Sequence, residues 1–119
     1  MSKIIVTGAA GLFGSHFSRH LTSQGHEVLG IDDLSGGFSS SVDENSLFVQ
    51  MNLLNAEGLA SVFSRFNPDY VYHFAAYAAE GLSPFIRNFN YSNNVLCSVN
   101  VINECIKNDV QKVIFTSSM

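Results

Sequence analysis

Five short apolar runs alternate with stretches of helical spacing along the 119-residue chain. We interpret the apolar runs as strands, and they cover Lys3–Thr7, Glu27–Ile31, Leu47–Met51, Tyr70–Phe74 and Lys112–Thr116. The stretches between them predict helices at Leu12–Gln24, Ala56–Phe66 and Phe89–Lys107. Strands that alternate with helices are joined by right-handed crossovers, so the pattern predicts an α/β fold with a parallel sheet.

The expected helices have recognisable ends and one clear apolar stripe. Gly25 follows the first helix as a natural C-terminal stop, and the second helix stops before Pro68. In the third helix, four aliphatic residues recur every three or four positions, which predicts a stripe buried against the core. These residues are Val95, Val99, Ile102 and Ile106.

The segment between the first strand and the first helix is rich in glycine, with Gly8, Gly11 and Gly14 three residues apart. Glycines let the main chain approach a ligand closely, and a helix N-terminus offers N–H groups and partial positive charge to a pyrophosphate. Asp32 ends the next apolar run, eighteen residues beyond Gly14. A carboxylate near that distance can accept both hydroxyls of an adenosine ribose, so these features together predict dinucleotide binding.

Small and polar residues gather at the carboxyl ends of the expected strands. Ligands of an open parallel sheet bind beyond these ends, where the strand order reverses. The ends carry Gly8–Gly14, Asp32-Asp33, Asn52-Leu53, Phe74-Ala75-Ala76 and Thr116-Ser117-Ser118. Asn52 is either an adenine contact or a turn residue. Ala75 and Ala76 either let a cofactor pass close to the backbone or serve tight helix packing.

Several segments, in order, resemble the extended short-chain dehydrogenase/reductase family, in particular its NAD-dependent nucleotide-sugar epimerases and dehydratases. The matching segments are Thr7–His16, Ile31–Ser35, His73–Ala76, Asn93–Val95 and Val113–Ser118. The resemblance spans the whole chain and covers the N-terminal part of such enzymes. It implies a Rossmann-type doubly wound parallel sheet, here with five strands and without the last strands and the substrate domain.

The resemblance also implies roles for individual residues. The pyrophosphate would be held by Gly8, Gly11, Leu12, Phe13 and Gly14. The adenosine side would be formed by Asp32, Asp33, Leu34, Ser35, Gly36, Gly37, Asn52 and Leu53, although many relatives carry aspartate where Asn52 stands. The cofactor groove would be lined by Phe74, Ala75, Ala76, Tyr77 and Asn93. Ser118 matches the catalytic serine or threonine that hydrogen-bonds the reacting sugar hydroxyl.

The charges near the expected ribose site favour NAD over NADP as the cofactor. Asp32 and Asp33 are adjacent, and no lysine or arginine occurs between Arg19 and Arg65. NADP requires a cation for its 2′-phosphate, which a carboxylate repels.

The resemblance implies transient oxidation of a sugar hydroxyl, as in 4-epimerisation of a UDP-sugar, with a Tyr-x-x-x-Lys pair as the acid–base group. None of the four tyrosines is followed by lysine at that spacing. We therefore expect residues 1–119 to be the NAD-binding Rossmann domain of a longer enzyme, inactive alone. The alternatives are a 4,6-dehydratase, a decarboxylase or a non-catalytic NAD-binding module.

Composition narrows the expected partners. Six basic and ten acidic residues give a net charge of −4, and without a basic stripe we expect neither nucleic acid nor an anionic membrane as a partner. The first strand begins too early for a signal peptide, and no apolar run approaches the roughly 20 residues that span a bilayer. We expect a nucleotide sugar, with a UDP-sugar favoured, as the substrate and a homodimer as the full-length enzyme.

The histidines and cysteines predict neither a metal site nor a disulfide. His16 and His20 have helical spacing but lack a third ligand, so no metal is expected. His73 is interpreted as a packed, hydrogen-bonded residue rather than a general base. Cys97 and Cys105 are about 12 Å apart along one expected helix, too far for a disulfide. Two reduced thiols are typical of a cytoplasmic protein.

Overall fold

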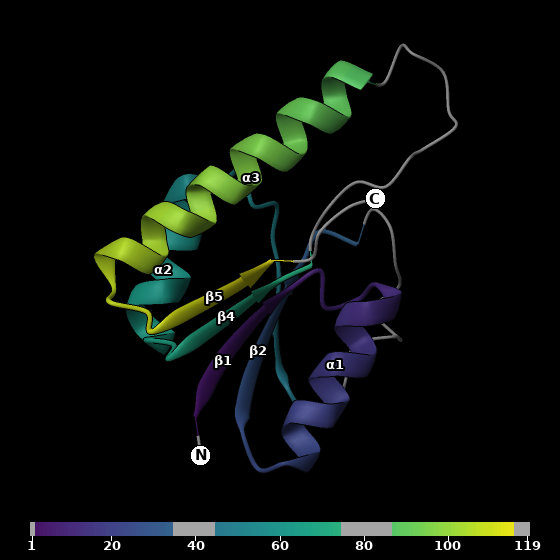
Figure 1. Ribbon diagram of the computed structural model, residues 1–119, viewed down its shortest axis with the longest axis vertical. Helices are drawn as coiled ribbons and strands as arrows, with labels where there is room; N and C mark the ends of the chain where they lie inside the picture. The colour runs from purple at the N-terminus through teal and green to yellow at the C-terminus, as the bar shows by residue number, and fades with distance from the viewer. Residues whose placement is uncertain (1, 35–44, 75–86, 116–119) are drawn as a thin grey trace.

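The computed structural model describes residues 2–34, 45–74 and 87–115 (Figure 1). In chain order the elements are β1 (Lys3–Thr7), α1 (Leu12–Ser23), β2 (Glu27–Asp32), β3 (Leu47–Gln50), α2 (Ala56–Phe66), β4 (Tyr70–His73), α3 (Arg87–Lys107) and β5 (Lys112–Phe115). Each strand and helix predicted from the sequence is present, with boundaries that differ by at most two residues.

All strand pairs in the sheet are parallel, and the strand order is β3-β2-β1-β4-β5. The chain steps outward from β1 to β2 and β3, and then returns to the other side of β1 with β4. The order therefore reverses between β1 and β4, which is where a doubly wound sheet binds its ligand. This topology confirms the predicted Rossmann-type fold.

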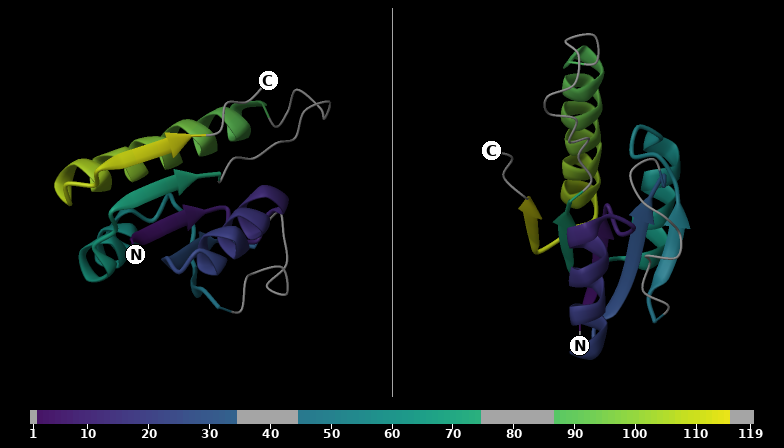
Figure 2. Two further views of the ribbon diagram at one scale, coloured as in Figure 1. Left: turned by 60° about the horizontal axis from the view of Figure 1, so that its bottom comes forward. Right: turned by 90° about the vertical axis from the view of Figure 1, so that its right-hand side faces the viewer.

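The sheet is covered by helices on both faces, with α1 on one face and α2 and α3 on the other (Figure 2). On the α2–α3 side, a core cluster includes Ile5, Leu59 and Phe63, each with a fully buried side chain. On the α1 side, a second cluster includes Val6 and Val28. Burial on both faces explains why the strands have continuous apolar runs rather than alternating ones.

The helix ends follow the sequence signals. Gly25, directly after the C-cap of α1, has a φ of +89°, and Asn67 ends α2 in the left-handed region before Pro68. The side chain of Asn55 caps the start of α2 by accepting a hydrogen bond from the Gly58 N–H at 3.0 Å. None of the described helices combines the length and the apolar character needed to cross a membrane.

The predicted buried face of α3 is wrong. Val99, Ile102 and Ile106 are 44%, 40% and 71% exposed, whereas the side chain of Val101 is fully buried. The buried face also contains both cysteines, Cys97 and Cys105. This helix carries apolar residues on two opposite faces, and spacing alone does not say which face meets the sheet. The side chain of Val95 is outside the described part of the structure.

Candidate functional site

The glycine loop between β1 and α1 has a backbone that only glycine accommodates at two points. Gly8 has a φ of +72°, and its N–H donates to the Ile31 carbonyl at 2.8 Å, which fastens the loop to the end of β2. A β-carbon at Gly14 would overlap the Gly8 carbonyl oxygen. The first turn of α1 therefore packs directly against the loop backbone, with no room for a side chain between them.

The N-terminus of α1 has no side-chain cap among the described residues. Gly11 is its N-cap, and the first turn contains no acidic residue. The first N–H groups of a helix have no acceptor within the helix, and the helix dipole adds partial positive charge at this end. The loop and the helix start therefore form a cradle suited to a phosphate group.

Asp32, the last residue of β2, lies beside this cradle. Its Oδ2 accepts the Ala10 N–H at 3.0 Å, and its Oδ1 accepts the Leu34 N–H at 2.7 Å. Each carboxylate oxygen has two lone pairs, so each retains capacity for a ribose hydroxyl after these bonds. The structure thus brings together the glycine loop and the carboxylate that the sequence places twenty-two residues beyond Ala10.

Asn52 and Asp33 face one another at the same edge of the sheet. The Asn52 Nδ2 is 3.5 Å from the Asp33 Oδ2, and the Asn52 Oδ1 accepts the Leu54 N–H at 2.8 Å. The second bond is typical of an Asx-turn, so Asn52 is a turn residue, and its contact with adenine stays a prediction. The side chain of Leu53 is 5% exposed and belongs to the core, which leaves its backbone for any ligand contact.

Helix α3 contributes two polar side chains to this edge that the sequence pattern does not predict. Asn100 donates from Nδ2 to the Leu53 carbonyl at 2.7 Å, and the Ser98 hydroxyl lies 3.2 Å from the His73 Nε2. The sequence signal that could have indicated these contacts is the position of Ser98 and Asn100, which lie next to the buried Cys97 and Val101. Cys97 precedes Ser98 on the same helix. Its burial, and then the negative charge of Asp33, raise the pKa of its thiol to about 11.

The two residues at the end of β4 lie on opposite faces of the sheet. His73 is 5% exposed, and its Nδ1 is 2.7 Å from the Thr7 Oγ1. Burial lowers the pKa of His73 to about 4, so its ring is neutral at pH 7. The interpretation of His73 as a packed, hydrogen-bonded residue is confirmed.

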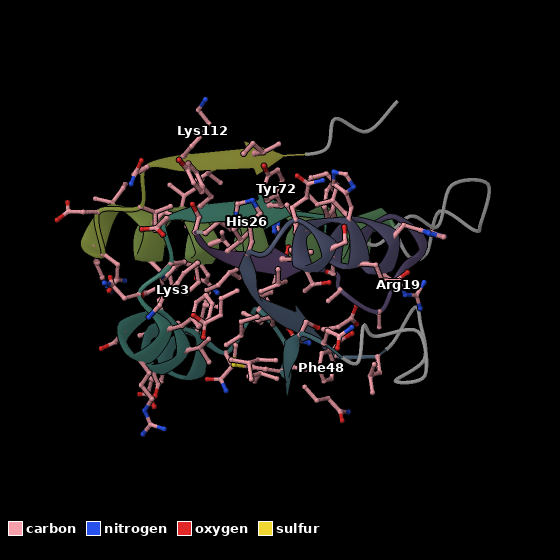
Figure 3. The ribbon with its side chains drawn as sticks, turned by 90° about the horizontal axis from the view of Figure 1, so that it is seen from below. Lys3, Arg19, His26, Phe48, Tyr72 and Lys112 are labelled. Atoms are coloured by element: carbon pink, nitrogen blue, oxygen red, sulfur yellow. The ribbon has the colours of Figure 1, made fainter. Side chains whose placement is uncertain are left out.

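Phe74 lies on the face that α1 covers. Its ring centroid is 5.5 Å from that of Phe17 and 6.3 Å from that of Tyr72, which Figure 3 labels on β4. The Phe74 N–H donates to the Thr7 carbonyl at 3.2 Å, so Phe74 continues the pairing of β4 with β1. Phe74 therefore borders the end of β1, close to the glycine loop.

Part of the predicted site cannot be placed. Seven residues lie outside the described residues, namely Ser35, Gly36, Gly37, Ala75, Ala76, Tyr77 and Ser118. Leu12 and Phe13 are at the start of α1 and Asn93 is in α3, but their side chains are not described.

The glycine cradle and its neighbouring carboxylate are accompanied by a direct family match. A model of the NAD dependent epimerase/dehydratase family matches residues 4–119. The chain belongs to this family. The resemblance predicted from the motifs is therefore confirmed, and the family's cofactor is the one that the paired aspartates predict.

Similar proteins include UDP-glucose 4-epimerases. The chain is 32% identical to that of Caenorhabditis elegans over 130 residues, covering 97% of this chain and 37% of the relative. A UDP-glucose 4-epimerase from Thermotoga maritima, solved with UDP-glucose, matches with a TM-score of 0.94 and 34% identity. That from Thermus thermophilus, solved with NAD, matches with a TM-score of 0.92 and 32% identity.

The match covers nearly all of this chain but a minor part of each relative. The two solved structures are covered to 38% and 37% of their lengths, and 98% of this chain is covered in both comparisons. The chain thus corresponds to less than two fifths of these epimerases.

Proposed function

We propose that residues 1–119 form the NAD-binding domain of a longer NAD-dependent enzyme that epimerises a UDP-sugar at C4. The observation that carries the proposal is the hydrogen bond from the Ala10 N–H to the Asp32 Oδ2. It joins the predicted phosphate cradle to the predicted ribose acceptor at the carboxyl ends of β1 and β2, next to the point where the strand order reverses. The relatives named above support epimerisation over dehydration, decarboxylation or a purely binding role.

The residues of this chain fit an adenine dinucleotide. The pyrophosphate lies against the N-terminus of α1 and the glycine loop, where a β-carbon at Gly14 would fill the space occupied by the loop backbone. Asp32 accepts the ribose hydroxyls, and Asp33 next to it disfavours the extra phosphate of NADP. The remaining contacts of this kind are Gly8, Gly11, Leu12, Phe13, Leu34, Ser35, Gly36, Gly37, Asn52, Leu53, Phe74, Ala75, Ala76, Tyr77 and Asn93.

NAD, when bound, supplies the hydride acceptor for transient oxidation of a sugar hydroxyl. Ser118 positions that hydroxyl by hydrogen bonding. A Tyr-x-x-x-Lys pair is absent from this sequence, so the proton transfer it performs requires residues beyond these 119. We therefore infer that the 119-residue chain binds NAD and has no epimerase activity alone.

We further infer that the full-length enzyme is a homodimer in the cytoplasm. The outward face of α3 supports self-association, because Leu96, Val99, Ile102 and Ile106 are 40% to 71% exposed. The charged residue between Leu96 and Ile106 is Glu104, and it is buried. Surface helices usually have charged residues on the outward face, so an uncharged aliphatic face favours a protein contact. Sedimentation velocity of the full-length protein tests this inference.

The function is tested by incubating the full-length protein with UDP-galactose and measuring UDP-glucose by chromatography. We expect conversion in the wild type and a loss of at least about tenfold in Ser118→Ala, since one hydrogen bond to the reacting group is removed. NAD titration of the same samples provides the control, because this variant should retain NAD affinity. NAD binding without conversion of any UDP-sugar would support the non-catalytic module.

A further inference from the structure

We propose that His73 is a positioning residue for the cofactor site: it fixes the end of β1, and thereby the glycine loop, through its bond to Thr7. The proposal rests on the NAD-binding function proposed above. Thr7 directly precedes Gly8, and its side chain is fully buried. The hydrogen bond between the Thr7 Oγ1 and the His73 Nδ1, 2.7 Å long, joins residues that are 66 positions apart in the sequence.

The imidazole connects three elements at the point where the strand order reverses. His73 ends β4, Thr7 ends β1, and Ser98 on α3 lies 3.2 Å from the second ring nitrogen. The main chains of the two strands are joined at the same level, since the Phe74 N–H donates to the Thr7 carbonyl at 3.2 Å. The end of β1 is therefore held through both its backbone and its side chain.

The chemistry of the ring suits this role. A neutral imidazole has one N–H donor and one acceptor nitrogen, whereas a hydroxyl both donates and accepts. Thr7 and Ser98 can therefore both be bonded whichever tautomer is present. Burial keeps the ring neutral at pH 7, since it lowers the pKa of His73 to about 4.

A displacement of Thr7 would also displace the phosphate cradle, because the loop backbone is fixed by a hydrogen bond and by close packing. Gly8 has a φ of +72° and is fastened to Ile31, so its orientation depends on the residue that precedes it. The Gly8 carbonyl in turn packs against Gly14, where even one added carbon would clash. Displacing the end of β1 therefore also displaces the first turn of α1, whose N–H groups face the pyrophosphate in the proposed complex.

Two variants of His73 separate positioning from packing. The amide of asparagine overlaps the position of Nδ1, and that of glutamine overlaps the position of Nε2. His73→Asn therefore preserves the partner of Thr7, and His73→Gln preserves the partner of Ser98. We expect the two substitutions to lower the Tm of the full-length protein by similar amounts. The Kd for NAD, measured by calorimetry, should rise about tenfold in His73→Gln and about threefold or less in His73→Asn.

The matched pair Thr7→Val and Ser98→Ala provides the same contrast if a His73 variant fails to fold. Thr7→Val should weaken NAD binding about tenfold, and Ser98→Ala should change it less than about twofold. The positioning role would be overturned if the two His73 variants bound NAD equally well, or if Thr7→Val and Ser98→Ala did. It would also be overturned if His73→Asn bound NAD more weakly than His73→Gln. Failure of the wild type to bind NAD would instead overturn the proposed function, so the two outcomes are distinguishable.

Discussion

The end of β1 is held on its two sides by different chemistry. On the β2 side, the carboxylate of Asp32 accepts two backbone N–H groups and is partly exposed. On the β4 side, the neutral ring of His73 lies between two hydroxyl groups and is buried. A carboxylate has acceptor capacity beyond two bonds, whereas both nitrogens of the imidazole already have a partner. The Asp32 side chain can therefore bind a ligand, while the His73 side chain holds the loop in place.

The largest expected effect concerns the β4 side and pH. The pKa of His73 is about 4 in the folded protein and 6.5 in an ordinary environment, so the unfolded chain takes up this proton first as the pH falls. Above pH 6.5, protonation of His73 makes no contribution to the free energy of unfolding. Between pH 6.5 and 4, it lowers the free energy of unfolding by about 3 kcal/mol. Urea denaturation at a series of pH values measures this change.

His73→Asn is the control for that series, because it has no imidazole to titrate. It should lack most of the decrease between pH 6.5 and 4, although its free energy of unfolding at pH 7 is lower than that of the wild type. A wild-type decrease that persists unchanged in His73→Asn would show that other groups cause it, and the difference between the two sides would then be smaller than the structure indicates.

The next effect concerns ligand binding on the β2 side. Asp32→Ala removes the acceptor for the ribose hydroxyls and one anchor of the glycine loop, so NAD affinity should fall by about 2 kcal/mol, or about 30-fold. Calorimetric titration with NAD and with NADP measures the change, and the preference for NAD should decrease as the negative charge is removed. Asp32→Asn retains one acceptor oxygen and should have an intermediate affinity. Wild-type binding of NADP that is tighter than that of NAD would contradict the role of Asp32.

The smallest effect tests how close the charges on the β2 side lie. Asn52→Asp retains the oxygen that accepts the Leu54 N–H but places a second carboxylate opposite Asp33. Both groups are exposed, so the repulsion should lower the free energy of unfolding by about 0.5 kcal/mol at low salt. Thermal denaturation at low and high salt measures this effect, which should decrease as salt screens the charges. Asn52→Ser can retain the turn bond and adds no charge. The difference between its free energy of unfolding and that of the wild type should therefore not depend on salt.

The two sides also differ in how far their residues can be predicted from the sequence. Asp32 was found because a carboxylate at the end of the second strand has a regular distance from the glycine turn. Ser98 and Asn100 were not found, because their partners His73 and Leu53 are 25 and 47 residues away. No local pattern specifies which loop a polar side chain on a long helix will contact.

The strands, the helices and the glycine turn follow from the sequence alone, since apolar periodicity, helix stops and glycine spacing are local properties of the chain. The sequence also predicted NAD as the cofactor, because adjacent carboxylates such as those of Asp32 and Asp33 repel the extra phosphate of NADP. The buried face of α3, by contrast, is set by packing in the folded chain: Cys97, Val101 and Cys105 are buried, and the aliphatic stripe is not. Both faces satisfy the helical period, and the choice depends on how α3 packs against the sheet and α2.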